Sequence, residues 1–297
     1  MSTQVTTAFV QQFSSNVQLL SQQRGSLLRG SVSEESVTGE KAFFDQVGAT
    51  AAVKRSSRHG DTPLVETPHS RRMVTMDTYE WADLIDDADK VRMLIDPTST
   101  YALAAAAAMG RAMDDAIIEA ALGTAKTGKS GATSTTLPGS QTIFTDGSTG
   151  TDGGGTAADL TVAKLITAKQ LLDEQSVDPS IRRFIACGPA QIASLLNDTN
   201  VTSSDFNTVK ALVRGEINEF LGFTFITSTR LDVASNVRSC FAWAEDGIKL
   251  AVGKDVMAKI DERADKSYST QVYYCATFGA TRMEEDKVVK IQCDESA

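Results

Sequence analysis

The longest periodic stretch of the chain runs from Asp96 to Leu122. Alanine and larger apolar residues recur there at mostly three- and four-residue intervals, as on one face of an α-helix. Asp96 can accept hydrogen bonds from the first free backbone N–H groups, Pro97 suits the first helical position, and Gly123 suits the position after the end. The pattern predicts a helix roughly 39 Å long. Its small side chains let other backbones approach closely, so we expect sheets to pack against it.

Residues 158–297 alternate between helical and strand patterns. Helices are predicted at 161–175, 189–196, 206–221 and, as a short one, 246–252. Strands are predicted at 184–187, 223–229, 239–243, 257–263, 271–280 and 287–291. The last strands are expected to return to the helix at 96–122. The fold class is therefore α+β, with a compact second lobe.

The first part of the chain offers too little apolar area for a core of its own. Residues 1–30 are rich in Gln and Ser with loosely spaced apolar residues, which is typical of an arm that becomes ordered against a partner. Phe43 and Phe44 form an apolar anchor. The polar, basic stretch that follows contains Pro63 and Pro68, which argue against a central strand. It predicts a long two-stranded loop that turns near residues 58–61 and projects from the body.

Composition narrows the class of protein. The chain has 297 residues, 41% of them hydrophobic and 23% charged, which is ordinary for a soluble globular protein of one large or two smaller domains. It contains no membrane-length apolar run and no signal-peptide pattern, so we expect cytoplasmic synthesis and residence. The four cysteines are far apart without a CxxC motif, which favours reduced core thiols: Cys187, Cys240, Cys275 and Cys293.

Charge is distributed unevenly along the chain. Residues 1–75 hold eight Lys or Arg and six Asp or Glu, a net charge of +2. Since the whole chain has a net charge of −9, residues 76–297 carry a net charge of −11. A basic arm on an acidic body indicates either a nucleic-acid tail or an arm that docks on the acidic body of a neighbouring copy. The body itself should repel nucleic acid.

The sequence GTAKTGKS at residues 123–130 matches the phosphate-loop pattern G-x-x-x-x-G-K-[ST]. A phosphate loop needs a buried strand before it and a helix after it, so that backbone N–H groups converge on the phosphates. Here a long helix precedes the motif, and GATSTTLPGS follows it. We therefore interpret the match as chance composition and predict no nucleotide site.

Other candidate chemistry is equally weak. Asp146 and Asp152 lie in DGSTGTDGGG, which lacks the further acidic ligands of a calcium loop and predicts a flexible turn. His59 and His69 lie in the projecting loop among arginines, without an orienting carboxylate in a cleft or a cysteine for a zinc site. We predict no catalytic residue, no cofactor and no metal, and hence no enzyme.

One acidic run precedes the long helix, at Asp83, Asp86, Asp87 and Asp89. Carboxylates suit a hard cation, but such a run is more often a solvated face or a patch that meets basic residues of another subunit. The intersubunit contact is favoured over a metal because the basic partner is present in the same chain. The expected intersubunit contact joins these acids to five cations of the projecting loop: Lys54, Arg55, Arg58, Arg71 and Arg72.

The order of parts resembles the major capsid proteins of tailed bacteriophages with the HK97-type fold. The residues that carry the resemblance are FFDQVG, TPHSRRMV, YEWADLIDDADKVRML and DPTSTYALAAAAAMGRAMDDAIIEAALGTAKTG between Phe43 and Gly128, with GEINEFLGFTFITSTRL in the second half. The resemblance implies an N-terminal arm (1–45), an extended loop (46–82), a peripheral domain with the spine helix and a Gly/Ser/Thr-rich insertion (83–157), an axial domain (158–250) and returning peripheral strands (251–297).

The resemblance also implies a function and partners. Copies of the chain would assemble through pentamers and hexamers, in the host cytoplasm, into an icosahedral virion head around double-stranded DNA held without sequence specificity. A portal, a separate scaffolding protein and decoration proteins are the further expected partners, and no membrane is involved. Two alternatives stay open: an encapsulin-like bacterial compartment of the same fold, and a P-loop nucleotide hydrolase.

Overall fold

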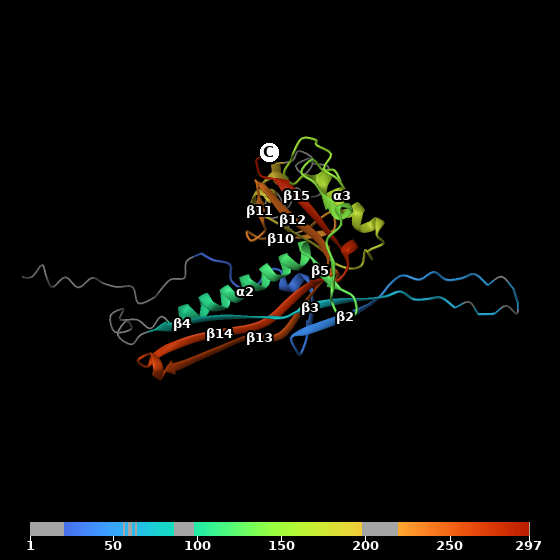
Figure 1. Ribbon diagram of the computed structural model, residues 1–297. Helices are drawn as coiled ribbons and strands as arrows, with labels where there is room; N and C mark the ends of the chain where they lie inside the picture. The colour runs from blue at the N-terminus through green and yellow to red at the C-terminus, as the bar shows by residue number, and fades with distance from the viewer. Residues whose placement is uncertain are drawn as a thin grey trace, which may run out of the picture.

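The computed structural model describes residues 21–55, 57–58, 61–62, 64–85, 98–197 and 219–296. A long helix lies along an elongated sheet, a compact lobe sits at one end of the helix, and a two-stranded loop projects away from both (Figure 1). The α-helices of the described residues are α2 (Thr98–Leu122), α3 (Val162–Glu174) and α4 (Pro189–Asn197). Within these residues, no helix is long and apolar enough to cross a membrane.

A four-stranded sheet supports the long helix α2. Its strand order is β1-β13-β14-β4, formed by β1 (Ser33–Ser36), β13 (Ile248–Arg263), β14 (Ser269–Arg282) and β4 (Asp77–Ile85). Strands β13 and β14 form a long antiparallel hairpin, and β4 pairs antiparallel with β14. Tyr79 of β4 stacks on Phe278 of β14 with ring centroids 4.5 Å apart.

A seven-stranded sheet forms the compact lobe, where α3 and α4 accompany it (Figure 1). Its strands are β7 (Thr142–Ile143), β15 (Val288–Asp294), β12 (Val237–Ala244), β8 (Arg183–Cys187), β10 (Phe223–Thr227) and β9 (Glu219–Phe220), in this spatial order, with β11 (Val233–Ala234) paired to β12. The last strand, β15, therefore lies in this sheet and not beside β13 and β14, where the sequence placed all of residues 251–297.

A second four-stranded sheet lies at the base of the projecting loop. Its order is β2-β3-β5-β6, formed by β2 (Lys41–Val47), β3 (His69–Thr75), β5 (Ala125–Thr127) and β6 (Thr133–Thr135). All three pairings are antiparallel. This sheet connects the loop to the C-terminal end of α2.

The core joins α2 to the seven-stranded sheet and to the sheet of β13 and β14. The buried face of the helix includes Met113 and Ile117, which share one hydrophobic cluster with Phe278 of β14 and Trp243 of β12. Gly110 shows why small residues matter on this helix. A Cβ atom there would lie 2.3 Å from the backbone of Gly25. The expectation that small side chains on α2 let another backbone approach is confirmed.

The approaching backbone is the N-terminal segment, residues 21–32. Asp114 of α2 is fully buried and accepts hydrogen bonds from the backbone N–H groups of Leu27 and Leu28, both at 3.1 Å, and from the Ser26 hydroxyl at 2.5 Å. Leu28 is fully buried in the main core, and the Trp243 indole donates to the Ser31 carbonyl at 2.9 Å. The expectation that all of residues 1–30 depend on a partner is therefore wrong for this segment, while residues 1–20 lie outside the described residues.

Most predicted elements are confirmed within a few residues. Thr161 caps α3 by accepting from the Lys164 N–H, as expected. The short helix expected at 246–252 is wrong, because a single 3₁₀ turn (Glu245–Gly247) leads directly into β13. Ile248, Leu250 and Val252 lie in the main core cluster, whereas Ala251 between them lies in the smaller cluster. Successive residues therefore face opposite sides, as in a strand.

The helix expected at 206–221 lies mostly outside the described residues. Its last part is wrong, because Glu219–Phe220 form β9, which pairs antiparallel with β10. Leu221 and Gly222 both have positive φ and make the tight turn between these two strands. Gly222 therefore lies in a turn between two strands and does not end a helix.

All four cysteines are buried and free, as expected of core thiols. Burial raises the pKa of the Cys187 thiol to about 12. A thiol with such a high pKa is protonated and unreactive at neutral pH.

The projecting loop and its base as candidate contact surface

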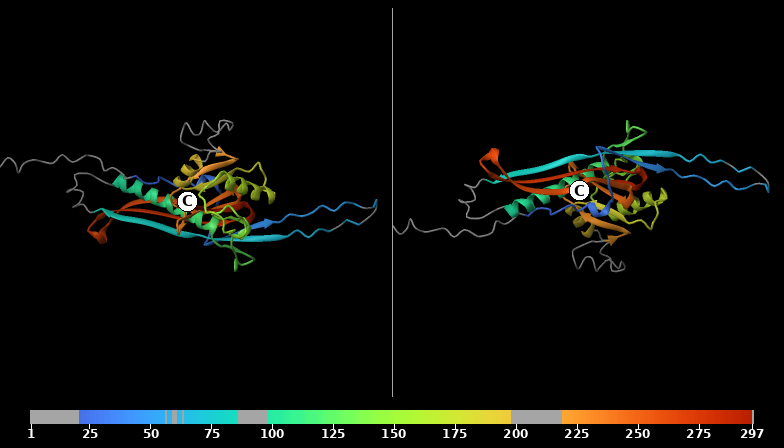
Figure 2. Two further views of the ribbon diagram at one scale, coloured as in Figure 1. Left: turned by 90° about the horizontal axis from the view of Figure 1, so that it is seen from above. Right: turned by 90° about the horizontal axis from the view of Figure 1, so that it is seen from below.

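The projecting loop extends well beyond the body in every view (Figure 2). Every described residue from 48 to 68 is exposed, including the apolar side chains of Leu64, at 97% exposure, and Val53, at 59%. The two arms are joined at their base, where the Gly48 N–H donates to the Pro68 carbonyl at 2.8 Å. Exposed leucine and valine on a thin extension make this loop a candidate contact surface.

The base of the loop is amphipathic because β2 and β3 alternate across the sheet. Ala42 and Phe44 of β2 and Val74 of β3 are buried in a small cluster with Ala251 and Met283, separate from the main core. The Lys249 ammonium lies 4.6 Å from the centre of the Phe44 ring. The expectation that Phe43 and Phe44 form an apolar anchor is therefore confirmed for Phe44, which packs on the body. Phe43 is 40% exposed.

Arg71 lies on the outer face of this hairpin. It is the register partner of Asp45 on β2, and its Nε donates to Asp45 Oδ1 at 2.5 Å. The guanidinium also lies 5.4 Å from the centre of the Phe43 ring. The hydrogen bond from Arg71 lowers the pKa of the Asp45 carboxyl. Both groups are solvent-exposed, so the pair contributes little to stability.

Arg72, the next residue, points the other way and is buried at 7% exposure. Its Nη2 donates to Glu285 Oε2 at 2.5 Å, and its Nε donates to the Met283 carbonyl at 2.8 Å. Gln46 donates to the same carbonyl at 2.7 Å. The expectation of an exposed cation free to meet a neighbour is wrong for Arg72, because its charge is used inside the subunit.

Glu285 links Arg72 to a second buried arginine. Arg282 is fully buried, with its Nε 3.6 Å from Glu285 Oε1. Its Nη1 donates to the carbonyls of Ala121, at 2.8 Å, and Gly123, at 2.9 Å, at the C-terminal end of α2. Those carbonyls lack helical partners, so a cationic donor satisfies them and favours the helix dipole. Burial lowers the pKa of Arg282, and the positive charge of Arg72 contributes.

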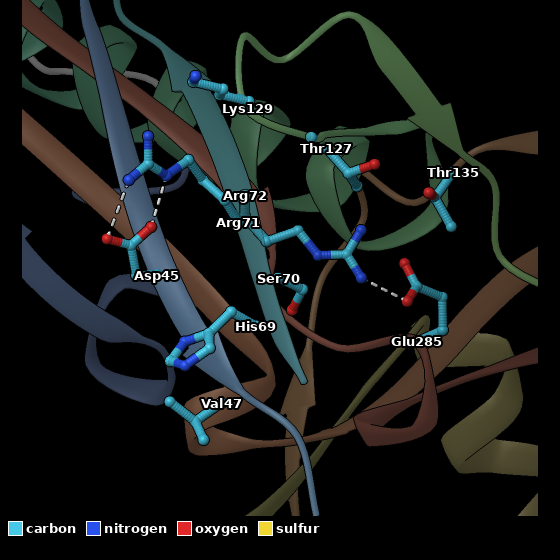
Figure 3. A pocket seen from close by; sticks show the side chains of 11 residues that line it. Asp45, Val47, His69, Ser70, Arg71, Arg72, Thr127, Lys129, Thr135 and Glu285 are labelled. Atoms are coloured by element: carbon cyan, nitrogen blue, oxygen red, sulfur yellow. Dashed lines mark hydrogen bonds and ion pairs between the residues drawn. The ribbon is translucent and has the colours of Figure 1, made fainter. Parts of the chain in front are cut away.

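A hollow of about 920 Å³ separates the outer half of the hairpin from the body (Figure 3). Residues of β2 and β3 line one side, and the β5–β6 hairpin with Glu285 lines the other. Arg72 reaches across toward Glu285, whereas Arg71 turns to Asp45 on the far side of β3 (Figure 3). His69 also lines the hollow.

The GTAKTGKS sequence forms a helix–strand–turn–strand unit. It begins at the end of α2, continues as β5, turns at Gly128 (φ +89°) and Gly131 (φ +71°), and returns as β6. The Gly128 N–H donates to the Arg71 carbonyl at 3.3 Å, which ties the turn to β3. Since a strand and not a helix follows the motif, its N–H groups do not form a phosphate loop.

The remaining predicted contact residues are only partly described. Lys54, Arg55 and Arg58 are exposed on the projecting loop, and Asp83 is half-buried on β4. Asp86, Asp87 and Asp89 lie outside the described residues, as does His59. The contact between these cations and acids stays a prediction. Across the described ranges, no group of three His, Cys, Asp or Glu side chains is placed to hold a metal ion.

Sequence reasoning missed Asp45, Asp114, Arg282 and Glu285. Asp45 carries one available signal, because closing the hairpin between Gly48 and Pro68 puts it opposite Arg71. Arg282 and Glu285 are three residues apart, a common ion-pair spacing, but nothing local shows that Arg72, over 200 residues earlier, completes the group. Such pairing depends on the tertiary fold.

Comparison with known proteins gives a consistent result. The family model described as phage capsid protein matches residues 5–295. Among solved structures, the capsid structure of the cyanophage P-SCSP1u has a TM-score of 0.74 and 18% identity, covering 98% of this chain and 94% of that one. The cyanophage Pam1 capsid has a TM-score of 0.72 and 13% identity, covering 98% of both chains.

A structure of Mycobacterium phage Che8 has a TM-score of 0.69 and 15% identity, covering 97% of this chain and 98% of that one. At such low identity these matches show the fold, and they confirm the α+β, HK97-like architecture expected from the sequence. Among curated proteins, no significant match is found.

Proposed function

The chain belongs to the phage capsid protein family and is a structural subunit of the virion capsid, and from this premise we propose that it forms the icosahedral head of a tailed phage through pentamers and hexamers. The observation that carries the proposal is the projecting loop, whose described side chains are all exposed although they include Leu64 and Val53. In a shell, neighbouring copies cover such side chains. A free monomer leaves them in water at a cost of about 25 cal/mol per Å² of apolar surface.

The proposal includes its partners. Packaged double-stranded DNA lies inside the shell without sequence-specific contacts, and the net charge of −9 limits sticking of the genome to the wall. A portal, a separate scaffolding protein and decoration proteins complete the head, which assembles in the host cytoplasm. The chain performs no catalysis in this function.

The loop cations contribute to assembly in this proposal. Lys54, Arg55 and Arg58 are exposed and meet the acidic run at residues 83–89 of an adjacent copy. Each exposed pair contributes well under about 1 kcal/mol, but the contact repeats around every ring. Assembly should therefore weaken as salt rises.

The direct test is electron microscopy of the purified full-length chain, alone and co-expressed with its scaffolding protein. Uniform closed particles support the proposal, and soluble monomers under both conditions contradict it. The variant Lys54→Glu, Arg55→Glu, Arg58→Glu should keep the subunit folded and abolish particles at low salt. Particle yields equal to the wild type at every salt concentration would show that these charges have no role.

A further inference from the structure

The direction in which the projecting loop leaves the body is fixed at its base. Residues 48–68 form no strand among the described residues, and every described side chain there is exposed. The base hairpin meets the β5–β6 hairpin at few positions, since β3 pairs with β5 at Arg72–Thr127 and Met73–Lys126. Its other contacts with the body include the Phe44 cluster and the hydrogen bond from Gln46 to the Met283 carbonyl. A small rotation of this hairpin moves the far end of the loop by a large distance.

The hollow beside the hairpin leaves space for such a rotation. Its volume of about 920 Å³ lies between residues 69–72 on one side and the β5–β6 hairpin with Glu285 on the other (Figure 3). In addition to the β3–β5 pairing, the Arg72–Glu285 ion pair and the long hydrogen bond from the Gly128 N–H to the Arg71 carbonyl join the residues on its two sides. The ion pair is the stronger of the two, because it is charged, short and buried.

The pair is also connected to the C-terminal end of helix α2. Glu285 lies between Arg72 and Arg282, and Arg282 donates to the carbonyls of Ala121 and Gly123 at the end of α2. Each member has further partners, since Arg72 also donates to the Met283 carbonyl. A guanidinium with several fixed acceptors has little rotational freedom, in contrast to an exposed pair such as Arg71–Asp45.

We propose that Arg72 is a positioning residue: through Glu285 and Arg282 it fixes the angle between the projecting loop and helix α2, and this angle determines the geometry of the shell. Without Arg72 the hairpin stays paired, because β2 and β3 keep all their register partners and Phe44 keeps its cluster. Its angle to the body becomes variable. The consequence for the shell rests on the proposed function, whereas the consequence for the angle does not.

The test compares Arg72→Met with Arg71→Met in the full-length chain. Methionine keeps an unbranched apolar stem and removes the charge and the donors. Arg71 is the matched control, since it is the adjacent residue of β3 and its ion pair stays within the hairpin. Thermal melting first establishes that both variants unfold cooperatively.

The angle is measured between two spin labels by pulsed electron paramagnetic resonance on unassembled protein. One label is placed at Val47→Cys, an exposed residue at the end of β2, and the other at Lys169→Cys on the exposed face of α3. The four native thiols are buried and do not compete for the label. We expect a broader and shifted distance distribution for Arg72→Met and a wild-type distribution for Arg71→Met. A folded Arg72→Met protein with the wild-type distribution would overturn the proposal.

If Arg72→Met does not melt cooperatively, Glu285→Gln decides, because it keeps the side-chain volume and one acceptor oxygen. It should shift the distribution in the same direction, and an unchanged distribution overturns the proposal.

Particles are then compared by electron microscopy. Mixed sizes for Arg72→Met beside uniform wild-type particles support the role in shell geometry, whereas uniform particles of wild-type size overturn that role. Failure of the wild type itself to form particles would count against the proposed function, and the distance measurement would still test the positioning of the loop.

Discussion

Two segments of the first 70 residues look alike in sequence and behave differently in the fold. Residues 21–32 and residues 48–68 are both polar, poor in large apolar side chains and without a helical or strand period. The first segment docks on its own subunit, with Leu28 fully buried in the core and the backbone N–H groups of Leu27 and Leu28 bonded to Asp114. The second has Leu64 at 97% exposure.

The difference lies in what the body offers each segment. Helix α2 presents a buried carboxylate to four donors and a glycine that admits the backbone of Gly25. Within the described part of the chain, the body presents no such carboxylate to residues 48–68. Apolar content alone therefore does not decide whether an arm belongs to its own subunit. A polar docking site on the partner element decides it, since a buried backbone must find hydrogen-bond partners.

The largest expected effect comes from removing each segment. Deletion of residues 1–32 should abolish the cooperative melting transition, because it removes the fully buried Leu28 from the core and uncovers the face of α2 around Asp114. Replacement of residues 49–67 by a short glycine-containing turn should leave the melting temperature of the subunit unchanged and abolish particles. Calorimetry and electron microscopy check the pair. A cooperative transition in the first variant would show that the N-terminal segment is dispensable for the fold.

A matched pair of leucine substitutions compares the same two segments by truncating one side chain in each. Leu28→Ala should lower the free energy of unfolding by about 2–5 kcal/mol, as is usual for a fully buried leucine. Leu64→Ala should change it by less than about 0.5 kcal/mol, as is usual for an exposed site, yet should reduce particle yield. Urea titration measures both. Equal destabilisation by the two substitutions would contradict the assignment of one leucine to the core and the other to a contact surface.

Asp114→Asn tests the polar half of the argument. The amide keeps one acceptor oxygen and places an NH₂ group against donors, so two of the four donors lose their acceptor. The expected loss is about 1–3 kcal/mol. Asp115→Asn is the control, because Asp115 is the adjacent residue and pairs with Arg230 at the surface. Denaturant unfolding of both variants gives the comparison, and similar losses would mean that burial of the carboxylate is not what matters.

The sequence predicted the regular elements well because their signals are local. The periodicity of residues 96–122, the Thr161 cap and the buried strand at 184–187 each depend on residues close in sequence. The short helix at 246–252 was wrong because the apolar residues of so short a stretch fit both a helical and a strand period. Pairing of Ile248–Val252 with β14 makes the stretch a strand. This pairing with β14 cannot be inferred from the seven residues alone.

The site was less predictable for the same reason. Arg71 and Arg72 are adjacent and chemically identical, so composition gave them one role. Alternation along β3 places one outward and one inward, and the inward one meets Glu285, 213 residues later. Alternation could have been used to separate the two arginines. The identity of the buried partner could not have been inferred without the fold.

The smallest expected effect concerns a third segment that also lacks regular structure, the Gly/Ser/Thr-rich excursion around Asp146. The Asp146 carboxylate accepts from the backbone N–H groups of Ser148, at 2.9 Å, and Gly155, at 3.1 Å, and from the Ser148 hydroxyl. These hydrogen bonds, with the Ser148 hydroxyl contributing most, lower its pKa to about 2. The segment is thus ordered by its own polar groups, unlike either arm.

A carboxyl group whose pKa is lower in the folded state contributes stability at pH values above its unfolded pKa of about 3.9. That contribution is lost as the pH falls from about 4 toward 2, where the folded group becomes protonated. Asp146→Asn should therefore be slightly less stable than the wild type at pH 7, and the difference should shrink below pH 4. Asp152→Asn is the control, since the Asp152 carboxylate accepts one backbone N–H, from Gly154. Melting temperatures measured from pH 7 to pH 2.5 give the comparison. A constant difference between Asp146→Asn and the wild type across this range would show that the carboxylate charge does not hold the loop.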